Sequence, residues 1–185
     1  MPLSDPASRR PIHTRKIHCH GYKRDDGLWD IEGQIIDTKT YDFDNKDRGT
    51  VHAGDPVHHM ILRLTVDDAL KVHDIEAVTE KSPYSICGAI TSSLKGLIGA
   101  SIKPGWRRDV LKHFGGTNGC THITDMLLGP LAVTAWQTIV PARQKRQAAA
   151  ASGNRPLLLD TCHALASTSP VVARDWPEFY QFDAD

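Results

Sequence analysis

Cysteine and histidine residues gather in this chain in a way that suggests metal binding. Cys120 and His122 follow the glycine-containing segment 115–119 and precede an apolar stretch with helical spacing. Glycines let the backbone approach closely, and a helix N-terminus stabilises a nearby thiolate, the form of cysteine that binds metals. The alternative is a buried cysteine beside a Thr or His helix cap. Both interpretations stay open from this motif alone.

Two other positions are weaker candidates for metal binding. Cys87 precedes Gly88 at a second junction between a strand and a helix, where a single cysteine is by default a small buried hydrophobe. His58 and His59 open a predicted strand after a loop that contains Gly and Pro. Either histidine could be a ligand while the other faces solvent.

A third group of candidate ligands lies near the N-terminus. His18 and His20 share one face of a predicted strand, and Cys19 takes the other face. The two histidines could bind a metal, but exposed strand histidines are the commoner outcome. Cys162 and His163 form a further pair in the C-terminal region.

Carboxylates surround the first predicted hairpin. They are Asp25, Asp26, Asp30, Glu32 and Asp37. Strand alternation puts Asp30 and Glu32 on one face and apolar residues on the other. A carboxylate near a metal can act as a general base, so Asp30 and Glu32 are the candidate catalytic residues. The alternative is a solvated strand face.

The elements that would position these residues run from strands to helices. Four segments read as strands: 16–23, 28–37, 59–66 and 72–79. An Asp-Gly turn joins the first two, and 40–56 reads as a loop. Three segments have helical spacing: 89–98, 106–114, and a longer one from 121 toward 147 that Gly129-Pro130 could kink. This order predicts an α+β fold, an antiparallel sheet with helices packed on one face.

Bulk composition limits the classes of partner. The 185 residues include 22 basic and 22 acidic side chains, so the formal net charge is zero. This balance gives no electrostatic footprint for nucleic acid or membrane. The opening residues lack the apolar region of a signal peptide, and no run approaches the roughly 18 apolar residues of a membrane helix. We therefore expect a cytoplasmic protein, whose four cysteines stay reduced and are not paired in disulfides.

Short motifs in the middle of the chain follow one another in a recognisable order. They are His58-His59-Met60, Val66-Asp67-Asp68, Cys87-Gly88-Ala89-Ile90-Thr91-Ser92-Ser93-Leu94, Gly99 and Cys120-Thr121-His122. In this order, residues 57–140 resemble the iron–sulfur cluster scaffold proteins of the IscU and NifU type. The resemblance implies a scaffold-like (SufE/NifU-type) core, to which the hairpin at 15–40 is an addition.

The resemblance also implies a ligand set. Its four members are His58, Cys87, Cys120 and His122. Two ligand positions of the scaffolds are lost, because Pro56 replaces their first cysteine and Gly119 replaces the histidine before their last cysteine. The remaining Cys2His2 set suits a divalent transition metal, with zinc as the first choice and iron or a two-iron cluster as alternatives. It leaves His18, His20 and Cys162 without a role.

Other motifs extend over nearly the whole chain. They are the run from Arg24 to Glu32, Asp37-Thr38-Lys39, His58-x-Met60 and Gly119-Cys120-Thr121-His122. On these motifs the chain resembles an uncharacterised bacterial family, domain-of-unknown-function family 2889. This second resemblance implies no activity.

The domain organisation predicted from these features is a single domain over 1–185. It consists of a loose arm at 1–14, the added hairpin at 15–40, the scaffold-like core at 57–140 and a C-terminal extension at 152–185.

The functional prediction is a small metal-dependent enzyme, a lyase or hydrolase that acts on a small organic molecule in bacterial metabolism. The alternative is a zinc or iron–sulfur carrier without catalysis, whose partner receives the metal. A third interpretation is a metal-free fold in which these cysteines and histidines are core and cap residues. The sequence leaves open whether the protein forms homo-oligomers.

Overall fold

The computed structural model describes residues 3–150 and 155–182, with side chains omitted at 147–150. The chain divides into two compact units, Met1–Ala135 and Trp136–Asp185. The predicted single domain and its internal boundaries stay predictions.

The first unit is built on an antiparallel sheet with the strand order β1-β2-β5-β6. The strands are β1 (His13–Lys23), β2 (Trp29–Lys39), β5 (Pro56–Val66) and β6 (Val72–Lys81). Lys23 pairs with Trp29 at the end of the first hairpin, and Gly27 in the intervening turn has a φ of 89°. Glycine adopts this left-handed conformation without steric cost, which explains the Asp-Gly turn.

Residues 40–56, expected to be a loop, contain a small hairpin. Its strands are β3 (Phe43–Asn45) and β4 (Gly49–Val51). The side chain of Asn45 accepts hydrogen bonds from the backbone N–H groups of Asp47 and Arg48. An asparagine that bonds the backbone in this way makes a local turn. The loop prediction was therefore wrong in part, because these strands are too short to show alternation.

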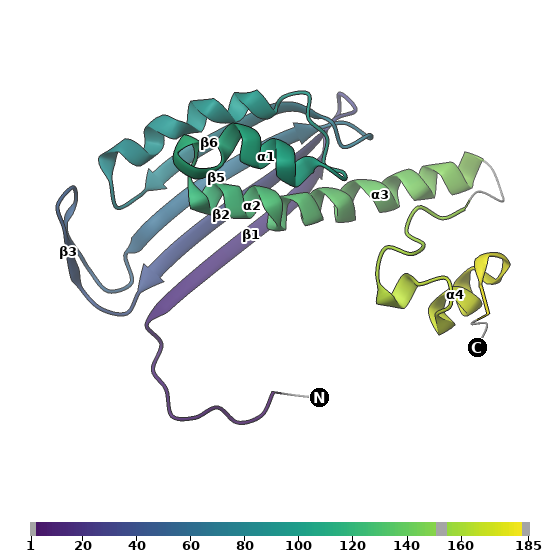
Figure 1. Ribbon diagram of the computed structural model, residues 1–185, viewed down its shortest axis with the longest axis horizontal. Helices are drawn as coiled ribbons and strands as arrows, with labels where there is room; N and C mark the ends of the chain where they lie inside the picture. The colour runs from purple at the N-terminus through teal and green to yellow at the C-terminus, as the bar shows by residue number, and fades with distance from the viewer. Residues whose placement is uncertain (1–2, 151–154, 183–185) are drawn as a thin grey trace. The chain divides into compact units, whose positions relative to one another are not determined.

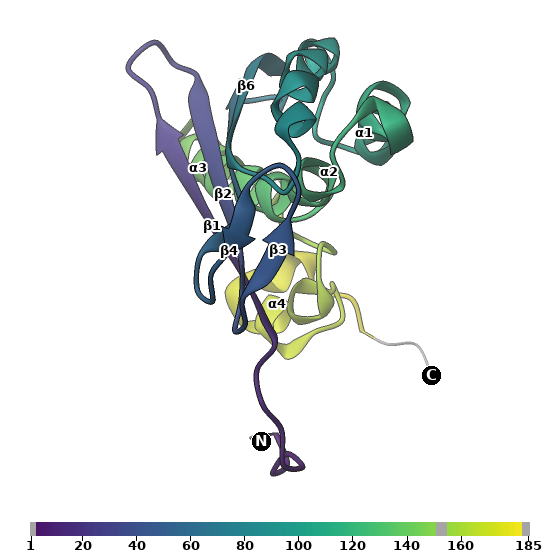
Figure 2. The same ribbon diagram turned by 90° about the vertical axis from the view of Figure 1, so that its left-hand side faces the viewer.

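Helical segments follow the sheet in the chain. They are η1 (Ser85–Leu97, a 3-10 helix), α1 (Trp106–Phe114), η2 (Gly116–Asn118), α2 (Thr121–Leu128) and α3 (Pro130–Ala150). Figures 1 and 2 show η1, α1 and α2 on the same face of the sheet. The predicted α+β architecture, with an antiparallel sheet and several helices, is thus observed. The long last helix is divided at Gly129-Pro130, as its sequence suggested.

The core of this unit lies between the sheet and the helices that cover it. Alternate residues of β2 and β5 point inward, and the helices contribute an apolar stripe. The fully buried side chains include Ile31, Ile35, Met60, Leu62, Leu64, Leu94, Leu97, Phe114, Ile123, Met126 and Leu127. The buried indole of Trp106 donates a hydrogen bond of 2.8 Å to the carbonyl oxygen of Leu127 and so joins α1 to α2.

The segment Thr121–Arg146 is more apolar than expected, since no run of this length was predicted to suit a membrane helix. Its 26 residues have a mean hydropathy of 1.2 in their most apolar window, which is long and apolar enough for a membrane helix by length and composition alone. A helix of a protein core passes the same test. Ile123, Met126 and Leu127 of this segment are buried in the core described above.

In the residues that the structure describes, the second unit contains the distal part of α3 and three short helices. They are η3 (His163–Leu165), α4 (Pro170–Asp175) and η4 (Pro177–Phe179). Ser169 caps α4 by accepting a hydrogen bond of 3.2 Å from the backbone N–H of Val172. Asp160 accepts a hydrogen bond of 2.8 Å from the backbone N–H of Ser167. These local bonds organise a small unit with little regular structure.

Candidate metal centre

Asp37 is a carboxylate on the inward face of the sheet. The alternation that buries Ile31 and Ile35 on β2 also directs Asp37 inward, where it is only 1% exposed. A buried charge needs a partner, and Arg15 on the neighbouring strand β1 supplies one. Its Nε and Nη2 donate to the two carboxylate oxygens at 2.8 and 2.9 Å. Arg15 therefore fixes the plane of the carboxylate.

Two imidazole rings meet the same carboxylate from different elements. His58 lies directly opposite Asp37 in the β2–β5 register, and its Nδ1 is 3.2 Å from Asp37 Oδ2. His122 comes from the first turn of α2, and its Nε2 is 3.4 Å from the same oxygen. The ring centroids of the two histidines are 3.7 Å apart. One ligand atom from each of the three residues lies within 4.8 Å of the other two, so together they could hold a metal ion.

The placement of His122 depends on a close approach of the backbone before α2. A Cβ atom at Gly119 would lie 1.9 Å from the carbonyl oxygen of Phe114, so only glycine fits there. Cys120 then forms the N-cap of α2, and its side chain does not cap the helix. The glycine-rich segment 115–119 thus allows the start of α2 to pack against the end of α1.

The two histidines are held in their neutral form. Burial, followed by the nearby His122, lowers the pKa of His58 from 6.5 to about 4. Burial also lowers the pKa of His122, although the charge of Asp37 acts in the opposite direction. The buried Nδ1 of His58 has no hydrogen-bond partner among the described residues, despite its closeness to Asp37. A neutral imidazole with an unused buried nitrogen is suited to ligate a cation.

The carboxylate of Asp37 keeps its charge in this environment. Burial alone would raise its pKa, but the hydrogen bonds and charge of Arg15 outweigh that effect and hold the pKa below its ordinary value. His13 Nε2 lies 3.5 Å from the other carboxylate oxygen. The carboxylate is therefore available as an anionic ligand on the side that faces the two histidines.

A cavity of about 530 Å³ opens beside the histidines. Its residues come from β5, η1 and the start of α2, and they are His58, Met60, Pro83, Tyr84, Ile86, Cys87, Ala89, Ile90, Thr117, Gly119, Cys120, Thr121 and His122. Cys120 Sγ lies 3.8 Å from His122 Nδ1, on the side of the ring opposite to the nitrogen near Asp37. The cavity is therefore lined both by the two imidazoles and by apolar side chains.

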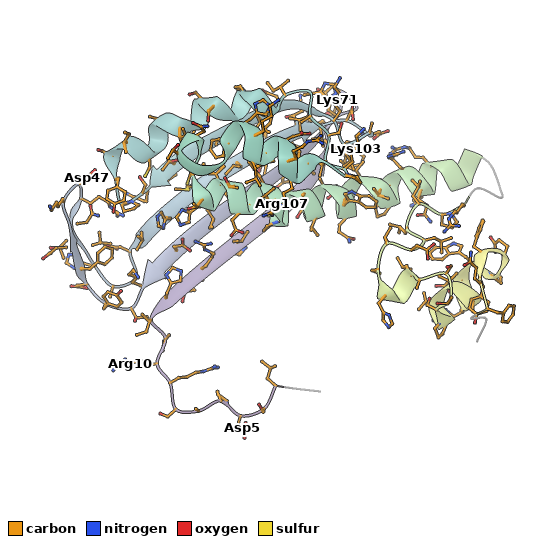
Figure 3. All side chains as sticks on the ribbon, viewed as in Figure 1. Asp5, Arg10, Asp47, Lys71, Lys103 and Arg107 are labelled. Carbon is orange, nitrogen blue, oxygen red and sulfur yellow. The ribbon has the colours of Figure 1, made fainter. Side chains whose placement is uncertain are left out.

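The end of the sheet that holds this site can be followed in the side-chain view. Asp47 lies at that end, and its carboxylate accepts a hydrogen bond of 2.7 Å from the backbone N–H of Ser85, where η1 begins. Lys71 and Lys103 lie at the opposite end of the sheet (Figure 3). The hairpin β3–β4 thus anchors the start of η1, which forms one wall of the cavity.

A family model described as "Protein of unknown function (DUF2889)" matches residues 13–137. The chain belongs to this family. The matched region of the DUF2889 family contains Arg15, Asp37, His58 and His122, so every residue of the cluster lies within it. No curated protein and no solved structure matches the chain. The resemblance of residues 57–140 to iron–sulfur scaffolds is therefore not confirmed.

In this DUF2889 chain, the four residues implied as ligands by the scaffold resemblance meet only in part. His58 and His122 converge, and Asp37 completes their cluster. Cys120 contacts the far nitrogen of His122, and Cys87 lines the same cavity. The described cysteines Cys19, Cys87, Cys120 and Cys162 are all free thiols.

The candidate catalytic carboxylates lie away from the cluster. Asp30 accepts hydrogen bonds from Thr65 at 2.7 Å and Arg24 at 3.2 Å. Glu32 accepts one from Arg63 at 2.8 Å. Both residues alternate with the inward positions of β2 and so face the opposite side of the sheet from Asp37. A role as general base at the metal centre has no support from this placement.

His18 and His20 also lie on the side of the sheet away from the cluster. They pair with Gln34 and Glu32 across β1 and β2, and the four side chains line a pocket of about 210 Å³. Cys19 alternates with them and lies against Gly33 on the inward side, with its Sγ 3.5 Å from the position of a Cβ on that glycine. His18 and His20 therefore stay outside the candidate centre.

The sequence motifs do not single out Asp37 or Arg15 as site residues. Asp37 was counted among the carboxylates of the hairpin, yet it occupies an inward position in the alternation with Ile31 and Ile35. A charged residue at an inward strand position was the available signal, because such residues are rarely buried without a functional or structural partner.

Proposed function

We propose that this protein is a metal-dependent enzyme of the lyase or hydrolase type, and that Asp37, His58 and His122 hold its divalent transition metal ion. The observation that carries the proposal is the convergence of a carboxylate oxygen and two imidazole nitrogens within 4.8 Å, beside a cavity. The partner is then a small molecule rather than a macromolecule.

The ligand set supports catalysis rather than a structural role. Structural zinc sites are usually closed by four protein ligands, whereas catalytic sites have three and keep a position for water or substrate. Two histidines with one carboxylate are typical of catalytic zinc and of non-haem iron(II). Zinc and iron(II) are thus the favoured ions.

The charge around the cluster supports an anionic ligand in the open position. Arg15 contributes one positive charge, and it contacts the carboxylates of both Asp37 and Asp125. These three groups sum to one negative charge, so a divalent ion with neutral histidines leaves one positive charge. An ion held by Asp37, His58 and His122 would therefore favour an anionic oxygen of the substrate as its further ligand. Lowering the pKa of such an oxygen is a common catalytic use of a metal ion.

The cavity favours an uncharged substrate with an apolar body. Among the described residues that line it, none is Lys, Arg, Asp or Glu. The side chains of Met60, Ile86 and Ile90 offer apolar contacts, while Thr117 and Thr121 offer hydroxyl groups. A small organic molecule with one oxygen for the metal and a hydrocarbon remainder fits this lining.

Two adjacent histidines on β5 provide a matched test of the metal site. His58 faces the cluster, whereas His59 faces the other side of the sheet and contacts Gln34 at 2.6 Å. Metal-free protein would be titrated with Co(II), whose visible absorption reports its ligands. We expect one bound ion in the wild type and in His59→Asn, and a loss of at least about tenfold in affinity in His58→Asn. Equal affinities in the two variants would refute the assignment.

A second measurement separates an enzyme from the alternative, a metal carrier of the kind suggested by the scaffold resemblance. Azide added to the Co(II) protein should change the visible spectrum, because an open position accepts an added ligand. An unchanged spectrum would indicate a site filled by protein groups, with a fourth protein ligand besides Asp37, His58 and His122. That result would favour the carrier and count against catalysis.

A further inference from the structure

A group of soft donor atoms lies on the cavity side of His122. Cys120 Sγ is 3.8 Å from the thioether sulfur of Met60 and 3.8 Å from His122 Nδ1. The three side chains come from β5 and from the start of α2, and all of them line the cavity. Asp37 is not part of this group, because it lies near the other ring nitrogen of His122.

These separations suit a metal ion bound between the donors. Metal–sulfur and metal–nitrogen bonds are about 2.3 and 2.0 Å long, which places neighbouring donors of a trigonal ion about 3.7–4.0 Å apart. The contacts of Cys120 with Met60 and His122 lie in that range. Two of the three donor–donor separations thus already suit a bound ion.

We propose that Met60, Cys120 and the Nδ1 atom of His122 form a site for a soft monovalent ion of the Cu(I) class. Thiolate and thioether ligands select soft ions, whereas carboxylates and water suit hard ones. Met60 is 1% exposed, and no carboxylate is among the described residues that line the cavity. The surroundings are therefore apolar and sulfur-rich, and they disfavour hard divalent ions.

The two sites share His122 through opposite ring nitrogens. A neutral imidazole has one lone pair and one N–H, so it offers one nitrogen at a time to a metal. An ion bound to Nε2 with Asp37 and His58 places the proton on Nδ1, and an ion bound to Nδ1 places it on Nε2. A soft ion and a divalent ion therefore compete for the protein, although the other ligands of each are different.

The test is an anaerobic competition for Cu(I) held by a chromophoric chelator. All proteins would carry Cys162→Ser, because this exposed thiol could bind Cu(I) by itself. We expect one equivalent of Cu(I) to bind to this background protein. Met60→Leu and Cys120→Ser should each weaken Cu(I) binding by more than about tenfold. Even the loss of a residue that only hydrogen-bonds a metal ligand can have an effect of about this size. His58→Asn, which removes no soft donor, should bind Cu(I) within about twofold of the background protein.

The same variants distinguish failure of this site from failure of the proposed function. Met60→Leu should keep its Co(II) affinity, and His58→Asn should lose it. Cu(I) uptake that is absent from the background protein, or equal in Met60→Leu, would overturn the soft-ion site and leave the Asp37 site standing. If the background protein bound Cu(I) but not Co(II), the Asp37 site would be overturned and the soft-ion site would stand.

A measurement on protein that keeps Met60, Cys120 and His122 does not depend on whether the variants fold. The chain has three methionines, Met1, Met60 and Met126. With their methyl groups labelled by carbon-13, Ag(I) should shift the NMR signal of Met60 and leave that of Met126, which is buried in α2. A Met60 signal that does not move at one equivalent of Ag(I) would contradict the site.

Discussion

Arg15 and Asp37 form a two-point ion pair across β1 and β2, with donor–acceptor distances of 2.8 and 2.9 Å. The remaining terminal nitrogen of Arg15 lies 3.2 Å from Asp125 in α2. One side chain thus connects two strands and the helix that carries His122. The carboxylate is held with one oxygen toward both histidines, so the pair orients the candidate centre as well as stabilising the fold.

A double-mutant cycle should reveal strong coupling between these two residues. We expect a coupling free energy of about 2 kcal/mol between Arg15→Met and Asp37→Asn, below that of a fully buried pair because the Arg15 side chain is 35% exposed. Urea denaturation of metal-free protein measures it. The surface pair Arg24–Asp26 serves as the control and should couple much more weakly. Equal coupling in the two pairs would argue against a special role for Asp37.

The stability of the metal-free protein should depend on the protonation of His58. Its pKa is lowered from 6.5 to about 4, so between these values the unfolded chain binds more protons than the folded one. The stabilisation is therefore complete above pH 6.5 and is lost as the pH falls toward 4. The loss at pH 4 should reach at most roughly 3 kcal/mol for this residue. Denaturation at several pH values in chelator measures it, and His58→Gln should show a flatter profile.

Divalent metal should stabilise the folded protein. An ion at about 100 times its dissociation constant adds about 2.7 kcal/mol if it binds only the folded state. For a chain of this size we expect the thermal midpoint to rise by roughly 5–10 °C with Zn(II) and to return with chelator. Asp37→Asn should lose the rise. Asp125→Asn should retain it, since Asp125 also contacts Arg15 but is not in the cluster. A rise that survives Asp37→Asn would place the ion elsewhere.

Gly119 should be intolerant of any side chain. A Cβ there would lie 1.9 Å from the Phe114 carbonyl oxygen, so the backbone at Gly119 or at Phe114 would have to move. We expect Gly119→Ala to destabilise the protein by about 3 kcal/mol and to weaken metal binding, because α2 carries His122. Gly88→Ala is the matched control, since no atom lies within 4 Å of its added methyl group. Chemical denaturation and Co(II) titration of both variants would test this.

Much of the fold follows from local signals in the chain. The helix predicted at 106–114 is α1 with the same limits, closed by Gly115. The Asp-Gly turn sets the first hairpin, and Gly129-Pro130 divides the last long helix. Each of these features depends on neighbouring residues, which is why periodicity and turn chemistry suffice to predict them.

The site is less accessible to prediction because it depends on register between distant segments. His58 opposes Asp37 only in the observed pairing of β2 with β5, and no local pattern determines that pairing. The scaffold resemblance selected His58 rather than His59 as a ligand, and the structure places His58 beside Asp37 and His59 beside Gln34. It also directed attention to cysteines, so the carboxylate that meets both histidines was missed.

The division of the ligands among β2, β5 and α2 also has a consequence for the order of folding. Asp37 and His58 come together when the central strands pair, but His122 arrives only when α2 docks on the sheet. Contacts between segments so far apart in the chain form slowly, since closing the long intervening loop costs entropy. The capacity to bind metal should therefore appear late in refolding, after the sheet signal in circular dichroism, and it would serve as a kinetic marker for the docking of the helix.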